Sequence, residues 1–322
     1  MGKSNNVWKR YFRNKRRLAD LFNGIYFQGE DVIKAEQLED ATEVYVAADA
    51  ENPGTLAKNK IVERIRDVKM KLHTGEIFRM LGIEDQNEID YTMPFRCMQY
   101  DTMEYGSQLD DLRRKNDEED CYSSWAERIC KVKKNDRIFP VYTLCLYHGE
   151  ELWDGPRCLK DMMEFGEDMD GMSKFFADYP FRLICLNEIE DFEVFHSEIK
   201  QLFKAAKYRK NKKKLCELME TDPEYWHMDG DTLEVMSVML NAPKLWENRK
   251  KYMKKEEEKE EYDMCQALRE LEEDARSEGI KEGIINTLVS LVKQGLLQVT
   301  DAARQADMSE SEFQEKLETW EV

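Results

Sequence analysis

Two acids and an amide in the segment 65–108 stand at strand-like positions whose spacing suits metal chemistry. Asp67 lies in one apolar-alternating run, and Glu84 and Gln86 lie in the next, with residues 73–75 as the turn between the runs. Residues two apart in a strand project from the same face, so Glu84 and Gln86 point together, and a hairpin register can bring Asp67 beside them. Carboxylate and amide oxygens that converge at one end of a hairpin suit a hard divalent cation such as magnesium. Such a site could activate water against a phosphodiester.

The alternative for Asp67 and Glu84 is a pair of surface acids on an edge strand. Glu84, however, follows the apolar run 80–83, which we expect to enter the interior. An acid in that position is costly unless it is bound to a metal or paired with a cation. The pattern therefore favours the metal site.

A series of short motifs in a fixed order extends this pattern through most of the chain. The series comprises Asp20-Leu21-Phe22-Asn23, Arg66-Asp67-Val68, Leu81-Gly82-Ile83-Glu84-Asp85-Gln86, Met93-Pro94-Phe95-Arg96, Tyr100-Asp101, residues 140–149 and Trp153-Asp154-Gly155-Pro156. In this order the motifs resemble the Rpn family of recombination-promoting nucleases and putative transposases, which belongs to the PD-(D/E)XK nuclease superfamily. One motif alone is weak, because E-x-Q occurs often by chance, whereas the ordered series is specific.

The resemblance implies a restriction-endonuclease-like α/β fold, with a mixed sheet flanked by helices and an all-α C-terminal extension. It implies that Asp67 and Glu84 bind Mg²⁺, with Mn²⁺ as the alternative ion, and that Gln86 takes the place of the superfamily's lysine. That exchange removes the cation that would orient the nucleophile. The implied activity is a metal-dependent DNA endonuclease associated with recombination or mobile elements. The word transposase stays a family label, because the sequence shows no acidic triad separated by long insertions.

Asp20 is a candidate for supporting this site. It falls on a helix that the spacing of apolar residues predicts over residues 8–27. In nucleases of this superfamily such a helix often packs over the active site, so Asp20 could reach the metal. An exposed or helix-capping acid is the alternative.

Arg96 is the second candidate for support. It follows Pro94, which is well placed in the first turn of a helix that we expect to run to about residue 114. From there Arg96 could hold a phosphate bidentately. Pairing with Asp90 or Asp101 is the alternative.

The charge of the chain is large and uneven. The net charge of −18 over 322 residues argues against tight nonspecific DNA binding. Cations nevertheless gather in residues 1–18, which contain no acid, and in residues 207–214, where six of eight residues are basic. Local fields decide where a polyanion docks, so the first run is a candidate DNA contact, with a solvated face or frayed terminus as the alternative. The candidate contact residues are Lys9, Arg10, Arg13, Arg16 and Arg17.

Cysteine spacing and hydropathy bear on metal binding and on the cellular compartment. The eight cysteines and four histidines form no C-x-x-C pair and no Cys/His cluster in the sequence, so we expect no structural zinc site. The sequence has neither an 18-residue apolar span nor a signal-peptide hydrophobic region. These features predict a cytoplasmic protein with no membrane partner.

Four units are expected along the chain. Residues 1–208 form the nuclease-like core, in which helix, hairpin, helix, strand and strand follow one another. Residues 209–243 form a helical subdomain, residues 244–283 form a long charged helix, and residues 284–322 form a small helical module that resembles a helix-turn-helix. The second short helix of that module is acidic, which is wrong for entering a major groove, so we favour packing or self-association there.

Two functional classes remain open at this point. The first is the magnesium-dependent endonuclease, with DNA as its partner and the basic amino terminus on the phosphate backbone. The second is a non-catalytic interaction protein on a nuclease fold, assembled through its helical tail. The set Asp67, Glu84 and Gln86 favours the enzyme, whereas the net charge and the missing lysine favour the alternative. A homodimer through the C-terminal helices would let two sites cut both strands.

Overall fold

The computed structural model describes residues 3–41, 67–83, 89–256 and 259–319. The α-helices are α1 (Lys3–Phe12), α2 (Lys15–Phe27), α4 (Met93–Glu119), α5 (Trp125–Cys130), α6 (Ile199–Tyr208), α7 (Lys212–Thr221), α8 (Gly230–Met239), α9 (Pro243–Glu247), α10 (Met264–Lys293), α11 (Val299–Gln305) and α12 (Glu310–Thr319). The strands are β1 (Leu38–Asp40), β2 (Asp67–Leu72), β3 (Ile77–Ile83), β4 (Val141–Tyr147), β5 (Arg182–Cys185), β6 (Met253–Glu256) and β7 (Lys259–Tyr262). Short 3₁₀ helices are η1 (Ala35–Gln37), η3 (Leu159–Met162), η4 (Glu167–Phe175), η5 (Leu186–Glu188), η6 (Pro223–Trp226) and η7 (Arg249–Lys251).

Five strands of the described chain form one mixed sheet in the order β1-β2-β3-β4-β5. β1, β2 and β3 pair antiparallel, whereas β4 lies parallel to β3 and β5 lies parallel to β4. The predicted hairpin between β2 and β3 is confirmed, with its turn at residues 73–76. Gly75 in this turn has a φ of +118°, a backbone conformation that glycine adopts at little cost.

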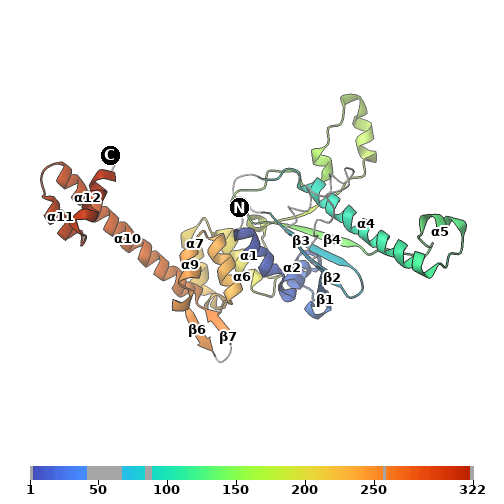
Figure 1. Ribbon diagram of the computed structural model, residues 1–322, viewed down its shortest axis with the longest axis horizontal. Coiled ribbons are helices and arrows are strands. Elements are labelled where there is room, and N and C mark those ends of the chain that lie inside the picture. Colours follow the sequence, from blue (N-terminus) through green and yellow to red (C-terminus); the bar gives the residue numbers. More distant parts are fainter. Residues whose placement is uncertain (1–2, 42–66, 84–88, 257–258, 320–322) are drawn as a thin grey trace.

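Helices cover both faces of the sheet (Figure 1). Leu144 and Leu146 of β4 belong to one hydrophobic core together with residues of α1, α2 and α6. Cys145 and Tyr147, which alternate with them, pack against Cys97 of α4 in a second core. Because β4 is buried on both faces, its sequence is a continuous apolar run rather than an alternation.

The predicted amino-terminal helix is divided into α1 and α2. Asn14 stands between them and accepts hydrogen bonds from the backbone N–H groups of Arg16 (3.0 Å) and Arg17 (3.4 Å). Such an N-cap satisfies donors that the first turn of a helix leaves free, so it starts α2 as a separate helix.

The main hydrophobic core continues past residue 208, the expected end of the nuclease-like core. Phe203 of α6, Tyr225 of η6 and Leu233 of α8 lie in the same cluster as the residues of α1 and α2. Tyr225 also donates its hydroxyl to the backbone oxygen of Gln201 at 2.6 Å. Packing therefore joins the helical subdomain to the sheet.

The long helix predicted over residues 244–283 is wrong in its first half. α9 is followed by the antiparallel hairpin of β6 and β7, and α10 begins only at Met264. Lys254 lies opposite Glu261 in the register of this hairpin, and its Nζ pairs with Asp263 at 2.8 Å. A segment rich in lysines and acids can therefore form charge pairs in a hairpin as well as in a helix. Backbone hydrogen bonds between Tyr262 and Met228, at 2.8 and 3.1 Å, tie the hairpin to the body and decide between the two.

Two segments extend from the body (Figure 1). α4 reaches beyond the sheet and is followed by α5. α10 leads to a small module in which α11 and α12 pack around the buried Phe313. Ser309 and Glu312 exchange hydrogen bonds and so form a capping box at the start of α12.

The architecture is a mixed α/β sheet flanked by helices, with a helical C-terminal region, as in a PD-(D/E)XK-like fold. Among the helices of the described residues, none combines the length and the apolar character needed to cross a membrane.

Candidate active site

The carboxyl ends of the parallel strands lie together at one end of the sheet. Ile83 of β3 pairs with Tyr147 of β4, which pairs with Cys185 of β5. β2 begins at the same end, where Asp67 lies opposite Leu81. Ligands of open α/β sheets bind outside the carboxyl ends of strands, so this end is the candidate site.

The structure describes the predicted catalytic residues to different extents. Asp67 is the first residue of β2, and the structure describes its backbone but not its side chain. Glu84 and Gln86 follow the last residue of β3 and also lie outside the described residues. The roles of all three in metal binding and catalysis stay predictions.

A buried ion pair lies beside Asp67 in sequence, on the face that α4 covers. The Nζ of Lys69 is 2.7 Å from the Oε2 of Glu104, and the two side chains are 8% and 6% exposed. Sequence reasoning missed this pair. The available signal was Glu104 at the i, i+7 position from Cys97, which places an acid on the apolar face of a helix.

Asp101 forms a second polar centre under α4. Its carboxylate accepts hydrogen bonds from the Oγ1 of Thr143 at 2.6 Å and from the hydroxyl of Tyr179 at 2.5 Å. Burial and the hydrogen bond to Asp101 raise the pKa of Tyr179 far above its ordinary value, so this hydroxyl stays protonated as a donor. Asp101 thus links α4 to β4 and to the segment before β5.

Arg96 is paired with Asp90 and donates a hydrogen bond to the hydroxyl of Tyr100 at 3.3 Å. Burial lowers the pKa of Arg96, but the hydrogen bond to Tyr100 and the pairing with Asp90 outweigh it, so the pKa lies above its ordinary value. The side chain of Arg96 is 26% exposed. The pairing with Asp90 is the alternative that the sequence left open, and any phosphate would have to compete with that carboxylate.

Asp20 is almost fully buried and joins α2 to the segment before α6. Its carboxylate accepts hydrogen bonds from the backbone N–H groups of His196 (2.9 Å) and Ser197 (2.8 Å), and from the hydroxyl of Ser197. Three donors from one turn satisfy most of the acceptor capacity of a carboxylate. Asp20 therefore holds α2 against the segment before α6. Its contact with a metal stays a prediction.

Two of the five candidate DNA-contact residues form ion pairs with acids at or near α8. Arg17 is 3% exposed, lies 4.0 Å over the ring of Tyr11 and pairs with Asp229, the N-cap of α8, and with Asp231 in its first turn. A guanidinium buried in this way has no access to a DNA backbone, so we assign Arg17 to the packing of α2 on α8. Arg10 pairs with Glu234 of the same helix.

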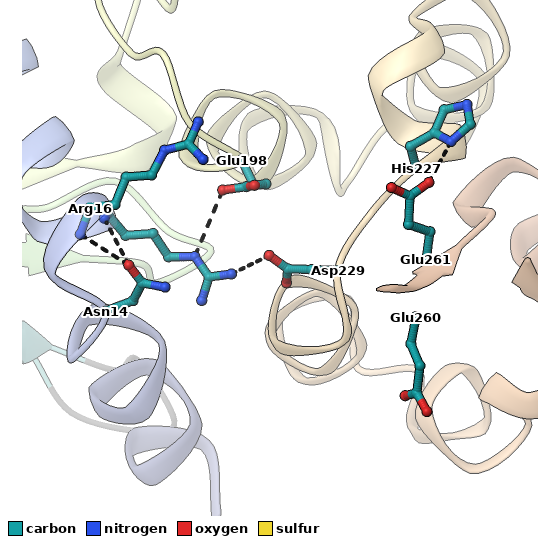
Figure 2. A pocket seen from close by; sticks show the side chains of 8 residues that line it. Asn14, Arg16, Glu198, His227, Asp229, Glu260 and Glu261 are labelled. Atoms are coloured by element: carbon teal, nitrogen blue, oxygen red, sulfur yellow. Dashed lines mark hydrogen bonds and ion pairs between the residues drawn. The ribbon is translucent and has the colours of Figure 1, made fainter. Parts of the chain in front are cut away.

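The other three candidates, Lys9, Arg13 and Arg16, form no ion pair within the described residues. Arg16, however, lines a cleft of about 420 Å³ whose other charged walls include Glu198, Glu260 and Glu261 (Figure 2). Glu261 lies 2.7 Å from the Nδ1 of His227. Because acids outnumber bases around this cleft, its field opposes the approach of a phosphate backbone.

The predicted metal ligands, Asp67 and Glu84, and the supporting Gln86 fit magnesium in their donor chemistry. Asp67, Glu84 and Gln86 all supply oxygen, which magnesium prefers. Asp67 and the end of β3 share one end of the sheet. Among the residues whose side chains are described, no group of three or more His, Cys, Asp and Glu could hold a metal ion.

The mixed sheet and its helical layers are consistent with a PD-(D/E)XK-like fold. The family model described as "Putative transposase, YhgA-like" matches residues 54–229, more than half of the chain. The chain therefore belongs to the YhgA-like putative transposase family, and the resemblance to the Rpn family is confirmed. No curated protein and no solved structure matches the chain.

Proposed function

We propose that this protein is a metal-dependent DNA endonuclease that hydrolyses phosphodiester bonds in recombination or in the movement of mobile elements. Membership of the YhgA-like putative transposase family supports action on DNA. The observation that supports the chemistry most is the pairing of β2 with β3, in which Asp67 lies opposite Leu81, three residues before Glu84.

In this proposal Asp67 and Glu84 hold the metal, and the amide of Gln86 orients the attacking water. A bound Mg²⁺, or Mn²⁺ in its place, would supply Lewis acidity to the phosphate and an acidified water. The ion pair of Lys69 with Glu104 fixes β2 against α4 and so fixes the backbone on which Asp67 stands. Arg96 would bind a phosphate only by exchanging Asp90 for it.

The test is plasmid nicking by the full chain with and without Mg²⁺ or Mn²⁺, with Asp67→Ala and Glu84→Ala as the active-site variants. A matched control is Asp31→Ala, which removes an exposed acid from the segment between α2 and η1. We expect both active-site variants to lose metal-dependent nicking while the control retains it. Nicking that persists in both variants, or no nicking by folded wild type with either ion, would contradict the proposal.

We also propose a homodimer through α10. The middle of this helix exposes Ile280 (55%) and Ile284 (47%), and an added Cβ at Gly279 or Gly283 would meet no described atom within 4 Å. Apolar side chains beside small residues let two helices approach closely. Sedimentation of the wild type and of Ile280→Glu tests this, because a dimer through α10 should dissociate in the variant. A variant that stays dimeric would show that the interface lies elsewhere. A monomeric wild type would refute the proposed dimer.

The non-catalytic alternative is favoured by the same exposed face of α10. It predicts self-association by a chain that never cleaves DNA. Measuring nicking and sedimentation on the same preparation separates the two functions.

A further inference from the structure

A run of cations over residues 207–214 lies at the end of the sheet that carries the candidate active site. We call this segment the second basic run. It joins α6 to α7, and six of its eight residues are basic. The six are Lys207, Arg209, Lys210, Lys212, Lys213 and Lys214. They divide into three that hold the run in place and three that face solvent.

Two of these cations fasten the second basic run to the loop that follows β4. Nη1 of Arg209 donates to the backbone oxygen of His148 at 2.8 Å, and Nζ of Lys210 lies 2.6 Å from Oε1 of Glu151. His148 directly follows the last residue of β4, which lies opposite Ile83, the last residue of β3. Arg209 is therefore bound one residue beyond the row in which β3 ends, at the candidate active site.

A third cation reaches the segment after β5. Nζ of Lys207 donates to the backbone oxygen of Ile189, which follows η5, and lies 5.5 Å from the centroid of the Phe192 ring. The side-chain amide of Asn187 in η5 donates to the backbone oxygen of Glu151 at 3.0 Å, so the segments after β4 and β5 are joined to each other. The second basic run is thus held against the carboxyl ends of both strands by several contacts.

The other three cations, Lys212, Lys213 and Lys214, form the first turn of α7. All three are exposed, and none has a carboxylate partner among the residues that the structure describes. Asn211 caps this helix by accepting from the backbone N–H of Lys214 at 3.1 Å. Nζ of Lys214 lies 5.6 Å from the centroid of the Tyr208 ring, a contact that leaves its charge in place.

The acids of α7 lie beyond its first turn, which contains none. Glu217 comes three residues after Lys214, and Glu220 is paired with Arg269 of α10 at 2.9 Å. The positive charge of this turn is therefore concentrated at the start of the helix, next to the segment that Arg209 anchors.

The amino-terminal basic run differs from the second basic run. There Arg10 and Arg17 are paired with acids, and Arg16 lines the cleft whose charged walls are mainly acidic. In a chain with a net charge of −18, uncompensated local cations decide where a polyanion can dock. The first turn of α7 offers such cations beside the candidate active site.

We propose that Lys212, Lys213 and Lys214 bind the phosphate backbone of a DNA duplex beside the candidate active site. Successive residues of a helix point about 100° apart, so three consecutive lysines spread their ammonium groups over an arc. Such an arc suits a row of phosphates better than one small anion. Lys212 is three residues from Arg209, so their Cα atoms lie within about 11 Å of each other, close to the carboxyl end of β4. The inference rests on the proposed action on DNA and adds the surface that holds the backbone.

The test measures the affinity of the full chain for a labelled DNA duplex by fluorescence anisotropy at several salt concentrations, in EDTA so that no strand is cut. The triple variant Lys212→Gln, Lys213→Gln and Lys214→Gln should lower the slope of log affinity against log salt by up to about 2.7, because each lost phosphate contact removes about 0.9. Its affinity should fall at least about ten-fold at roughly 0.1 M salt. The corresponding triple change to arginine keeps the charges and should bind like the wild type.

Two control variants remove exposed cations elsewhere on the chain. Lys250→Gln with Lys251→Gln changes two consecutive lysines of η7 that also lack a carboxylate partner within the described chain. Arg13→Gln with Arg16→Gln changes the amino-terminal basic run. Both controls should keep the affinity and the salt slope of the wild type. Urea unfolding checks that the glutamine variant is folded, and the arginine variant carries the comparison if its stability differs.

Several results would overturn the inference. They are no duplex binding by the wild type, the wild-type salt slope in the triple glutamine variant, an equal loss for the η7 control, and a loss confined to the amino-terminal variant. An RNA duplex that binds more tightly than the DNA duplex would overturn the choice of DNA. Binding that depends on the α7 lysines in a chain that never nicks plasmid would uphold the inference and refute the endonuclease. Nicking by a chain whose affinity ignores these lysines would do the reverse.

Discussion

Replacing Arg17 by methionine should lower stability without changing how DNA binding depends on salt. Arg17 belongs to the basic amino terminus, yet only 3% of it is exposed. Methionine keeps an unbranched apolar stem and removes the charge. The variant therefore separates packing from DNA contact at one position.

The magnitude follows from the partners of Arg17. Its three acids, Glu198, Asp229 and Asp231, have side chains that are 33%, 39% and 51% exposed, so each pair contributes only about 0.2–1 kcal/mol. The contact over the buried ring of Tyr11 at 4.0 Å adds up to about 2 kcal/mol. Release of the buried guanidinium from its desolvation offsets part of this loss. We expect a net loss of about 2 kcal/mol in the free energy of unfolding.

The assay is urea unfolding together with DNA affinity at several salt concentrations, with Arg16→Met as the matched control. Arg16 is the exposed neighbour without an ion pair in the described structure, so its loss should change stability by less than about 0.5 kcal/mol. A lost contact to a duplex phosphate would lower the salt slope by about 0.9. Wild-type stability in Arg17→Met combined with a lower salt slope would refute the assignment of Arg17 to packing.

Three further predictions concern the sheet and its turn. Glu104→Ala should cost about 3–5 kcal/mol in urea unfolding, because Lys69 keeps a buried charge after losing this carboxylate, and the double change Lys69→Met with Glu104→Leu should recover most of it. A double variant less stable than Glu104→Ala would contradict this. Burial lowers the pKa of His148 to about 3, whereas in the unfolded chain it stays near 6.5. Because the unfolded chain binds the proton first, the free energy of unfolding should be constant above about pH 6.5. It should fall as the pH drops from about 6.5 toward 3, by up to about 1.4 kcal/mol per pH unit. His148→Phe, which keeps a ring to stack on Trp8, should remove that part of the pH dependence, and identical pH profiles would argue against it. Gly75→Ala should destabilise the protein by about 1–3 kcal/mol because of its φ of +118°, whereas a wild-type melting temperature would show that the turn tolerates a side chain.

The sequence determined the local elements and the family. The hairpin of β2 and β3 and its turn around Gly75 depend on residues within a few positions, so their pattern predicted them correctly. The ordered motifs identified the family that the comparison confirmed. Local patterning failed for residues 244–263, where Lys and Glu suit a helix and a hairpin alike, and contacts with Met228 made the choice.

The tertiary structure alone decided which charges meet and which rings come into contact. The sequence predicts Arg17 to be a free cation, whereas in the folded protein it pairs with Asp229, which is 212 residues away in the chain. Tyr26 and Tyr142 become neighbours only because α2 lies across the start of β4. The physical reason is that backbone propensity and hydrophobic period act over one or two turns of chain, whereas burial of a charge or exposure of a ring depends on segments that only the assembled core brings together.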